Sequence, residues 1–148
     1  METLIEEILV NIKKTDKEIK SYSLLSLAFL GDSIHSLFVR SKIVSDKTFK
    51  VKDLHSKTTK FVKAKSQSFV LEKILETLTE DEKQIVKSGR NAKTNNIAKN
   101  STIKDYKLAT AFECLLGFLA LQNNFTRLNL ILNLSYDIIK REVKNNNI

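Results

Sequence analysis

The stretch LLSLAFLGDSIHSLF, residues 24–38, indicates the fold class of this chain more directly than any other segment. Apolar or small residues recur in it every three or four positions, which places them on one face of an α-helix: Leu24, Leu27, Gly31, Ile34 and Phe38. A second stretch, LATAFECLLGFLAL at residues 108–121, carries the strongest amphipathic helical pattern in the chain. We therefore expect two long helices that pack against each other as the main elements of the core.

The remaining segments also predict helices. Helical periodicity extends over residues 54–78 and 125–143, and Thr79 followed by Glu82 is a capping box that starts a short helix to about Ser88, with Gly89 at its C-terminal end. Residues 90–101 show no periodicity and predict a loop. No segment alternates like a strand, so the predicted fold is an all-α helical bundle.

Composition narrows the possible types of fold further. With 148 residues, 42% of them hydrophobic, the chain suits one folded domain over residues 1–148, with residues 145–148 expected to fray. Zero Pro and three Gly argue against a turn-rich β-fold, and one Cys excludes an internal disulfide. Residues 1–20 lack the pattern of a signal peptide, and the apolar run at 108–121 is short for a membrane span, so we expect a cytoplasmic protein.

The net charge of +8 lies mainly in the middle of the chain. Residues 46–107 hold fifteen basic and eight acidic side chains, with the bases gathered in residues 47–65 and 87–107. A single lysine-rich block is often only a solvated helix face. Two such blocks that carry nearly all of the net charge favour a polyanionic partner, most simply a nucleic acid.

Two acids interrupt the apolar faces. Glu113 lies about 20° around the helix from Ala120 and about 40° from Ala109, which places it inside the apolar stripe. Asp32 shares its face with the apolar residues Leu25, Ala28, Phe29 and Val39. We expect both carboxylates to face the core, where they are costly unless they are paired, hydrogen-bonded or bound to a metal.

Two explanations of these acids remain open from the residues. Each acid could pair with a buried base or cap a neighbouring helix. Alternatively, Asp32 and Glu113 converge and hold a divalent cation, for which Mg²⁺ is the natural choice and Mn²⁺ a substitute. With a basic surface, the second explanation points to metal-dependent cleavage of a nucleic acid.

The same residues resemble a known family. The segment Leu27–Ser33 resembles the Leu-Gly-Asp signature helix of the ribonuclease III family, and Ala109–Gly117 resembles its second catalytic helix. Intervening positions are similar to the Mini-III subfamily, a nuclease domain without a double-stranded-RNA-binding domain: Leu54, His55, Val62, Ala64, Gln67, the run Gly89–Lys93, Lys99, Asn100 and Tyr106. The resemblance spans residues 24–121 in consistent order.

This resemblance implies a function. It implies an all-helical homodimer in which Asp32 and Glu113 are catalytic and bind Mg²⁺, and which cleaves double-stranded RNA. The implied substrate is the large-subunit (23S) ribosomal RNA precursor, matured at its 5′ and 3′ ends, with a large-subunit ribosomal protein as a possible helper. The larger family carries two further acids at positions that hold Ala28 and Thr110 here, a reduced set that Mini-III proteins share.

The basic loop is the expected RNA contact. Arg90, Asn91, Lys93 and Lys99 are candidates for binding the RNA backbone, because affinity for a duplex comes mainly from phosphate contacts. His55 is expected to be structural rather than catalytic. Two other functions remain as alternatives: a non-catalytic RNA-binding or ribosome-assembly protein on the same fold, and a helical protein whose basic face meets an acidic protein.

Overall fold

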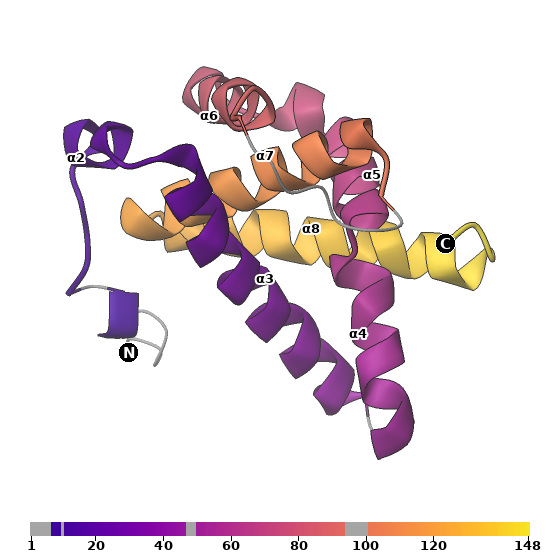
Figure 1. The fold of residues 1–148 in the computed structure, drawn as a ribbon. Helices are drawn as coiled ribbons and strands as arrows, with labels where there is room; N and C mark the ends of the chain where they lie inside the picture. The colour runs from indigo at the N-terminus through magenta and orange to yellow at the C-terminus, as the bar shows by residue number, and fades with distance from the viewer. Residues whose placement is uncertain (1–6, 10, 47–49, 94–100) are drawn as a thin grey trace.

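The computed structural model describes residues 7–9, 11–46, 50–93 and 101–148. Within these ranges the regular elements are helices and none is a strand, which confirms the expected all-α fold (Figure 1). In chain order the elements are α2 (Asp16–Ser21), α3 (Leu24–Ser45), η1 (Val51–Asp53), α4 (Leu54–Val62), α5 (Ala64–Ile74), η2 (Leu75–Thr77), α6 (Glu80–Arg90), α7 (Ile103–Leu121) and α8 (Phe125–Lys144).

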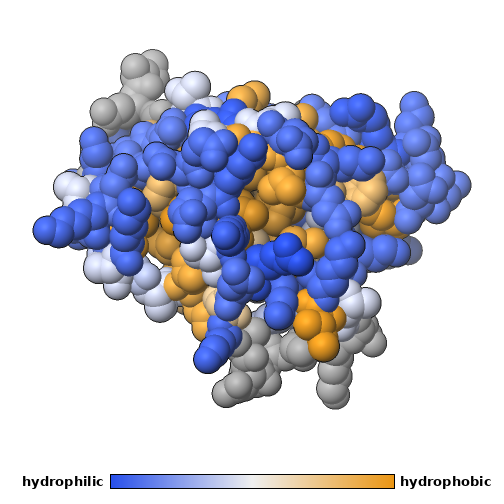
Figure 2. All heavy atoms as spheres, turned by 90° about the horizontal axis from the view of Figure 1, so that it is seen from above, coloured by the Kyte–Doolittle hydropathy of each residue, from blue (hydrophilic) through white to orange (hydrophobic). Residues whose placement is uncertain are grey.

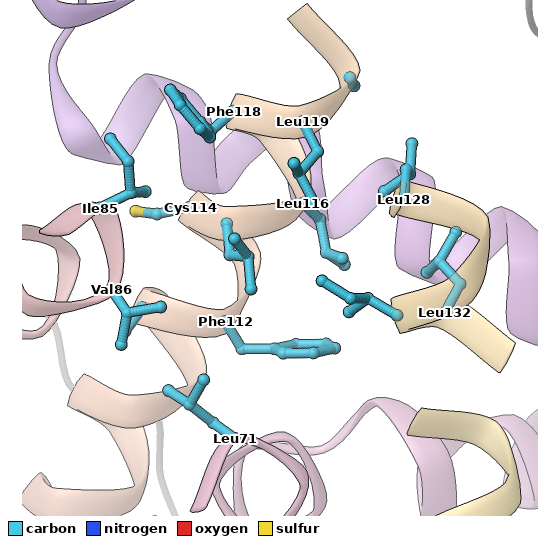
Figure 3. Close-up of a cluster of buried hydrophobic side chains, with 14 of the residues drawn as sticks. Leu71, Ile85, Val86, Phe112, Cys114, Leu116, Phe118, Leu119, Leu128 and Leu132 are labelled. Carbon is cyan, nitrogen blue, oxygen red and sulfur yellow. The ribbon is translucent and has the colours of Figure 1, made fainter. Parts of the chain in front are cut away.

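Helix α7 is the centre of the bundle, in contact with α3, α5, α6 and α8. Its side chains from Cys114 to Leu121 are all buried. Figure 3 shows Leu116 and Phe112 of this helix among apolar side chains from α5, α6 and α8. The sequence pattern predicted one apolar face, but the C-terminal half of α7 is covered on all sides, as expected for a helix that is apolar all round.

Helices α3 and α7 cross with their backbones in contact. A Cβ atom on Gly31 would lie 1.8 Å from the carbonyl oxygen of Glu113, and one on Gly117 would lie 2.1 Å from the carbonyl oxygen of Leu27. A side chain at either position would overlap the neighbouring backbone, so the two helices approach this closely only because both positions are glycine. The two glycines thus fix the register of α3 against α7.

The helical pattern expected over residues 54–78 is confirmed, but it is divided between two helices, α4 and α5. Lys63 has extended backbone angles (φ −63°, ψ 153°), which end α4 and let α5 start in a new direction. The hydroxyl of Ser66 donates to the carbonyl oxygen of Lys60. This hydrogen bond crosses the break and gives a partner to a carbonyl group in the last turn of α4. The new direction carries Ser66, Gln67 and Ser68 into the interior, where each is at most 2% exposed.

Helix α6 begins with the predicted capping box, because the Thr79 hydroxyl accepts from the Glu82 N–H and the Glu82 carboxylate accepts from the Thr79 N–H. The predicted end at Gly89 is wrong. The helix continues to Arg90 and is capped at Asn91, while Gly89 packs against Ala111 and Cys114 of α7. Gly89 therefore serves close helix packing rather than chain reversal.

A buried ion pair joins α6 to α8. Arg127 donates from Nε and Nη2 to the Glu82 carboxylate at 2.8–3.1 Å, and Nη2 also donates to the Thr77 carbonyl at 2.9 Å. Burial opposes ionisation of Glu82, but the hydrogen bonds from Arg127 and Thr79 outweigh burial, so its pKa is lowered. The charge of Glu82, which is 3% exposed, is thus compensated within the fold.

The residues after α8 form a hydrogen-bonded turn. Asn146 adopts a positive φ of 58°, and the Asn147 N–H donates to the Glu142 carbonyl at 2.9 Å. Ile148 packs against the core. Among the described residues, no helix has the length and apolar character needed to cross a membrane.

Candidate active site

The structure brings Asp32 and Glu113 together. Gly31 lies directly against the backbone of Glu113, so the next residue along α3, Asp32, is carried to the same crossing point of α3 and α7. The two acids are close enough for the Asp32 carboxylate to raise the pKa of Glu113. The convergence follows from the helix crossing.

The surroundings of Asp32 differ from the prediction. We expected this side chain to face the core of its own chain, but it is exposed. Of its apolar neighbours, Ala28 is buried, whereas Leu25 is 44% and Phe29 80% exposed. Helix α3 carries more apolar surface than α7 can cover. The side of α3 that holds Leu25, Phe29 and Asp32 therefore faces outward.

Glu113 is the partly buried member of the pair. Burial raises its pKa to about 8, the Asp32 carboxylate adds to the rise, and a hydrogen bond from the Gln67 side chain acts in the opposite direction. Burial and a nearby like charge both favour the neutral form of a carboxylic acid. Without a bound cation, Glu113 is therefore largely protonated at neutral pH.

No buried base neutralises this pair in the part of the chain that the structure describes. Within the described ranges, the ion pairs join Lys83 to Glu80, Lys104 to Glu72 and Arg127 to Glu82, and none involves Asp32 or Glu113. The side chain of Asp32 also caps none of the described helices. The two structural explanations left open by the sequence, pairing with a base and capping a helix, therefore do not describe these acids.

Two neighbouring polar residues were not identified from the sequence as parts of a site. His35 of α3 and Gln67 of α5 are 3% and 1% exposed, and Gln67 Nε2 lies 2.9 Å from His35 Nδ1. Burial lowers the pKa of His35 to about 4, so the ring is neutral at physiological pH. Both interrupt apolar helical stripes of the sequence. Asp32 and Glu113 were identified as polar residues inside such stripes, and the same criterion would also have identified His35 and Gln67.

The donor set fits a hard divalent cation held by few protein ligands. No group of three or more His, Cys, Asp or Glu side chains that could hold a metal occurs in the part of the chain that the structure describes. Mg²⁺ commonly uses one or two carboxylates and completes its shell with water and substrate phosphate. Asp32 and Glu113, whose negative charges oppose each other and which have no basic partner within the described ranges, match that requirement.

The predicted RNA-contact residues follow α6. Arg90 ends the helix and is exposed, Asn91 caps it, and Lys93 is exposed just beyond. Lys99 lies outside the described residues. Because Gly89 packs against Ala111 and Cys114, this basic segment starts within one turn of Glu113 along α7. The face that carries α6 is mainly hydrophilic, with apolar atoms between the polar side chains (Figure 2).

A shallow cavity of about 280 Å³ lies beside this segment, and basic residues line part of it. The lining residues are Leu71, Glu72, Leu75, Lys83, Val86, Lys87, Arg90, Asn91 and Leu108. The other histidine, His55, is exposed in the first turn of α4, on a different helix from either acid.

Comparison with known proteins gives consistent matches. A family model described as the ribonuclease III domain matches residues 25–124. A protein named Mini-ribonuclease 3 from Thermoanaerobacter sp. (strain X514) is 44% identical over 141 residues, covering 95% of this chain and 99% of the relative. One of the same name from Clostridium tetani is 39% identical over 132 residues, covering 88% and 87%. A solved Fusobacterium nucleatum structure has a TM-score of 0.74 at 34% identity, covering 84% of this chain and 98% of that one.

Proposed function

Since the chain belongs to the ribonuclease III family, within its Mini-ribonuclease 3 group, and is therefore an RNA endonuclease, we propose that Asp32 and Glu113 form its active site and that double-stranded RNA is its substrate. One observation supports the assignment of the site. At the crossing of Gly31 with the Glu113 backbone, the two carboxylates are close enough for Asp32 to raise the pKa of Glu113, and neither has a basic partner among the described residues.

In this proposal Asp32 and Glu113 hold Mg²⁺, for which Mn²⁺ can substitute. When bound, the cation supplies charge stabilisation at the phosphate and an ionised water as nucleophile. Asp32 is exposed and can meet an incoming RNA backbone, whereas Glu113 anchors the site from its partly buried position. Glu113 must lose its proton to act as a ligand, and the Gln67 amide favours that anionic form.

The proposed substrate in the cell is the 23S ribosomal RNA precursor, cut in the cytoplasm at its 5′ and 3′ ends. We propose that residues 1–148 form one nuclease domain and that a large-subunit ribosomal protein can assist. The net charge of +8, concentrated in the middle of the chain, supports a duplex polyanion as partner. Sequence readout should be weak, because the major groove of A-form RNA is too narrow for side chains to enter.

A cleavage assay tests the proposal. The purified protein should cut a duplex RNA that contains precursor ends when Mg²⁺ or Mn²⁺ is present, and should be inactive with a chelator. Single-stranded RNA and duplex DNA of the same sequence serve as controls and should remain uncut. Duplex binding without cleavage under all conditions would favour the RNA-binding or ribosome-assembly alternative, and no RNA binding would favour an acidic protein partner.

We also propose that two copies of the chain pair through the exposed apolar face of α3. Leu25, Phe29, Leu37 and Val44 lie on one side of this helix and are 44–80% exposed. Ile34 and Phe38, which the sequence placed in the apolar stripe of this helix, pack against the core of their own chain instead. A second copy is the fitting occupant, because cutting both strands of a duplex requires two sites and a two-fold dimer is the commonest oligomer.

Sedimentation should show a dimer at micromolar concentration. Phe29→Asp should convert it to a monomer, because a charge would then have to be buried in the apolar contact. Val51→Asp is the matched control, since Val51 is also exposed, at 85%, but lies outside α3. A parent protein that stays monomeric and fully active would overturn the dimer proposal.

The basic segment after α6 should bind phosphate without selecting sequence. Arg90→Ala combined with Lys93→Ala should weaken duplex RNA binding and reduce the slope of log affinity against log salt by about one for each phosphate that is no longer bound. Cleavage positions should stay the same. The double variant Lys17→Ala with Lys20→Ala, on α2, removes the same charge elsewhere as a control. Equal slopes for the parent and the loop variant would exclude the segment as the RNA contact.

A further inference from the structure

A buried polar pair lies next to the proposed active site, and the mechanism described so far uses only the effect of Gln67 on the charge of Glu113. His35 and Gln67 are at most 3% exposed, and their nitrogen atoms lie 2.9 Å apart. Buried polar groups lower stability unless they are hydrogen-bonded, and apolar residues at both positions would fill the same space. Their presence in the core therefore calls for a function besides packing.

The pair is held in one orientation. An amide nitrogen can only donate, so Gln67 Nε2 donates to an unprotonated His35 Nδ1. The His35 ring is held in turn by the ring of Phe112, edge to face, with the ring centroids 5.2 Å apart. The Gln67 amide group has a second hydrogen, which remains available for another acceptor.

The Glu113 carboxylate is the acceptor that this hydrogen can serve, since a hydrogen bond from the Gln67 side chain is one of the effects that set the pKa of Glu113. His35 lies one helical turn after Asp32 on α3, and Phe112 precedes Glu113 on α7. The break at Lys63 directs α5 toward this point, so that the Gln67 side chain reaches Glu113 from a third helix. An amide N–H fixes both the position and the rotation of a carboxylate that accepts it.

We propose that Gln67, oriented by His35, is a positioning residue that aims the Glu113 carboxylate at the point it shares with Asp32, and so sets how tightly the two acids hold a divalent cation. The inference rests on the proposed function, because it takes Asp32 and Glu113 to be the cation ligands. It adds a third helix and two residues to the site.

Binding of Mn²⁺ to the metal-free protein, followed by electron paramagnetic resonance of the free ion, tests this role without activity. Gln67→Met keeps the length of the side chain and removes the amide, and should weaken Mn²⁺ binding about 10- to 100-fold, the usual effect of losing such a partner. Steady-state cleavage with saturating metal should show a lower kcat with little change in KM for RNA. Thermal melts of the same samples report stability.

The double variant Gln67→Met with His35→Phe separates positioning from folding. Replacing both polar partners with apolar groups should restore much of the stability that Gln67→Met alone removes. Mn²⁺ affinity should nevertheless stay low, because the amide is still missing. If affinity recovers together with stability, the pair is only structural and the positioning role is wrong.

Two controls keep the outcomes distinct. Ile131→Ala, buried on α8, should lower stability and leave Mn²⁺ affinity at the parent value. A parent that neither binds Mn²⁺ nor cuts duplex RNA would overturn the proposed function itself. A parent that does both, with Gln67→Met binding Mn²⁺ equally well, would overturn only the role of Gln67.

Discussion

Glu113→Gln should reduce cleavage of duplex RNA by about 10²-fold or more while the protein still folds and binds the duplex. The substitution keeps the shape of the side chain and removes its charge, and removing one preorganised electrostatic interaction at a reacting phosphate has an effect of roughly this size. Duplex binding should persist, because it depends on basic residues elsewhere. A cleavage time course beside a binding titration measures both quantities.

The metal-free stability of this variant should depend on pH in a specific way. The pKa of Glu113 is raised to about 8 in the folded protein, so the folded state binds more protons than the unfolded state between about pH 4.5 and 8. The free energy of unfolding of the parent therefore falls as pH rises through this range, and Glu113→Gln removes the decline. At pH 8.5 the variant should be more stable than the parent by about 1 kcal/mol or more.

His35 acts in the opposite direction but over a lower range. Its pKa is lowered to about 4, so its contribution to the free energy of unfolding grows with pH and is complete above about pH 6.5. Melts at pH 6.5 and 8.5 with a chelator therefore isolate Glu113. Glu76→Gln, at an exposed position, is the control.

Two results would contradict the assignment of Glu113. A loss of about 3–5 kcal/mol in Glu113→Gln would indicate that a buried base had been left unpaired. Cleavage at the parent rate would show that the charge of Glu113 has no part in the reaction. Either result would make Glu113 a structural residue.

Gly31→Ala should prevent normal folding or lower the free energy of unfolding by about 3 kcal/mol or more, at the upper end for a single substitution. The new Cβ atom would lie 1.8 Å from the carbonyl oxygen of Glu113, and backbone on both sides of the contact cannot move without separating α3 from α7. Urea unfolding followed by circular dichroism measures the loss. Any Gly31→Ala protein that folds should also lose cleavage activity, since the movement of α3 away from α7 separates Asp32 from Glu113.

Gly89→Ala provides the graded comparison. There a Cβ atom would meet Cys114 Sγ and the Ala111 Cα at 3.0 Å, a tighter contact than usual but far less severe than at Gly31. Its stability loss should therefore be smaller than that of Gly31→Ala. Gly31→Ala with the stability and activity of the parent would show that the close crossing of α3 and α7 does not hold the site together.

The sequence predicted the local features of this protein well. Periodicity located the long helices, and the Thr79 capping box identified the start of α6 to the residue. Both depend on neighbours within a few positions along the chain, which a sequence displays directly. Periodicity likewise singled out Asp32 and Glu113, because a charge in an apolar stripe is visible without knowing what lies opposite.

Only the tertiary structure decided which groups each residue contacts. Glycine is needed at positions 31 and 117 because the backbone of another helix lies where a side chain would be. The break at Lys63 has no Pro or Gly beside it that would have predicted it. The sequence placed Asp32 toward its own core, but the structure exposes it, because a pattern shows which face is apolar and not what covers that face. Gln67 reaches Glu113 only after α5 turns into the bundle, so this contact between distant segments depends on packing rather than on local sequence.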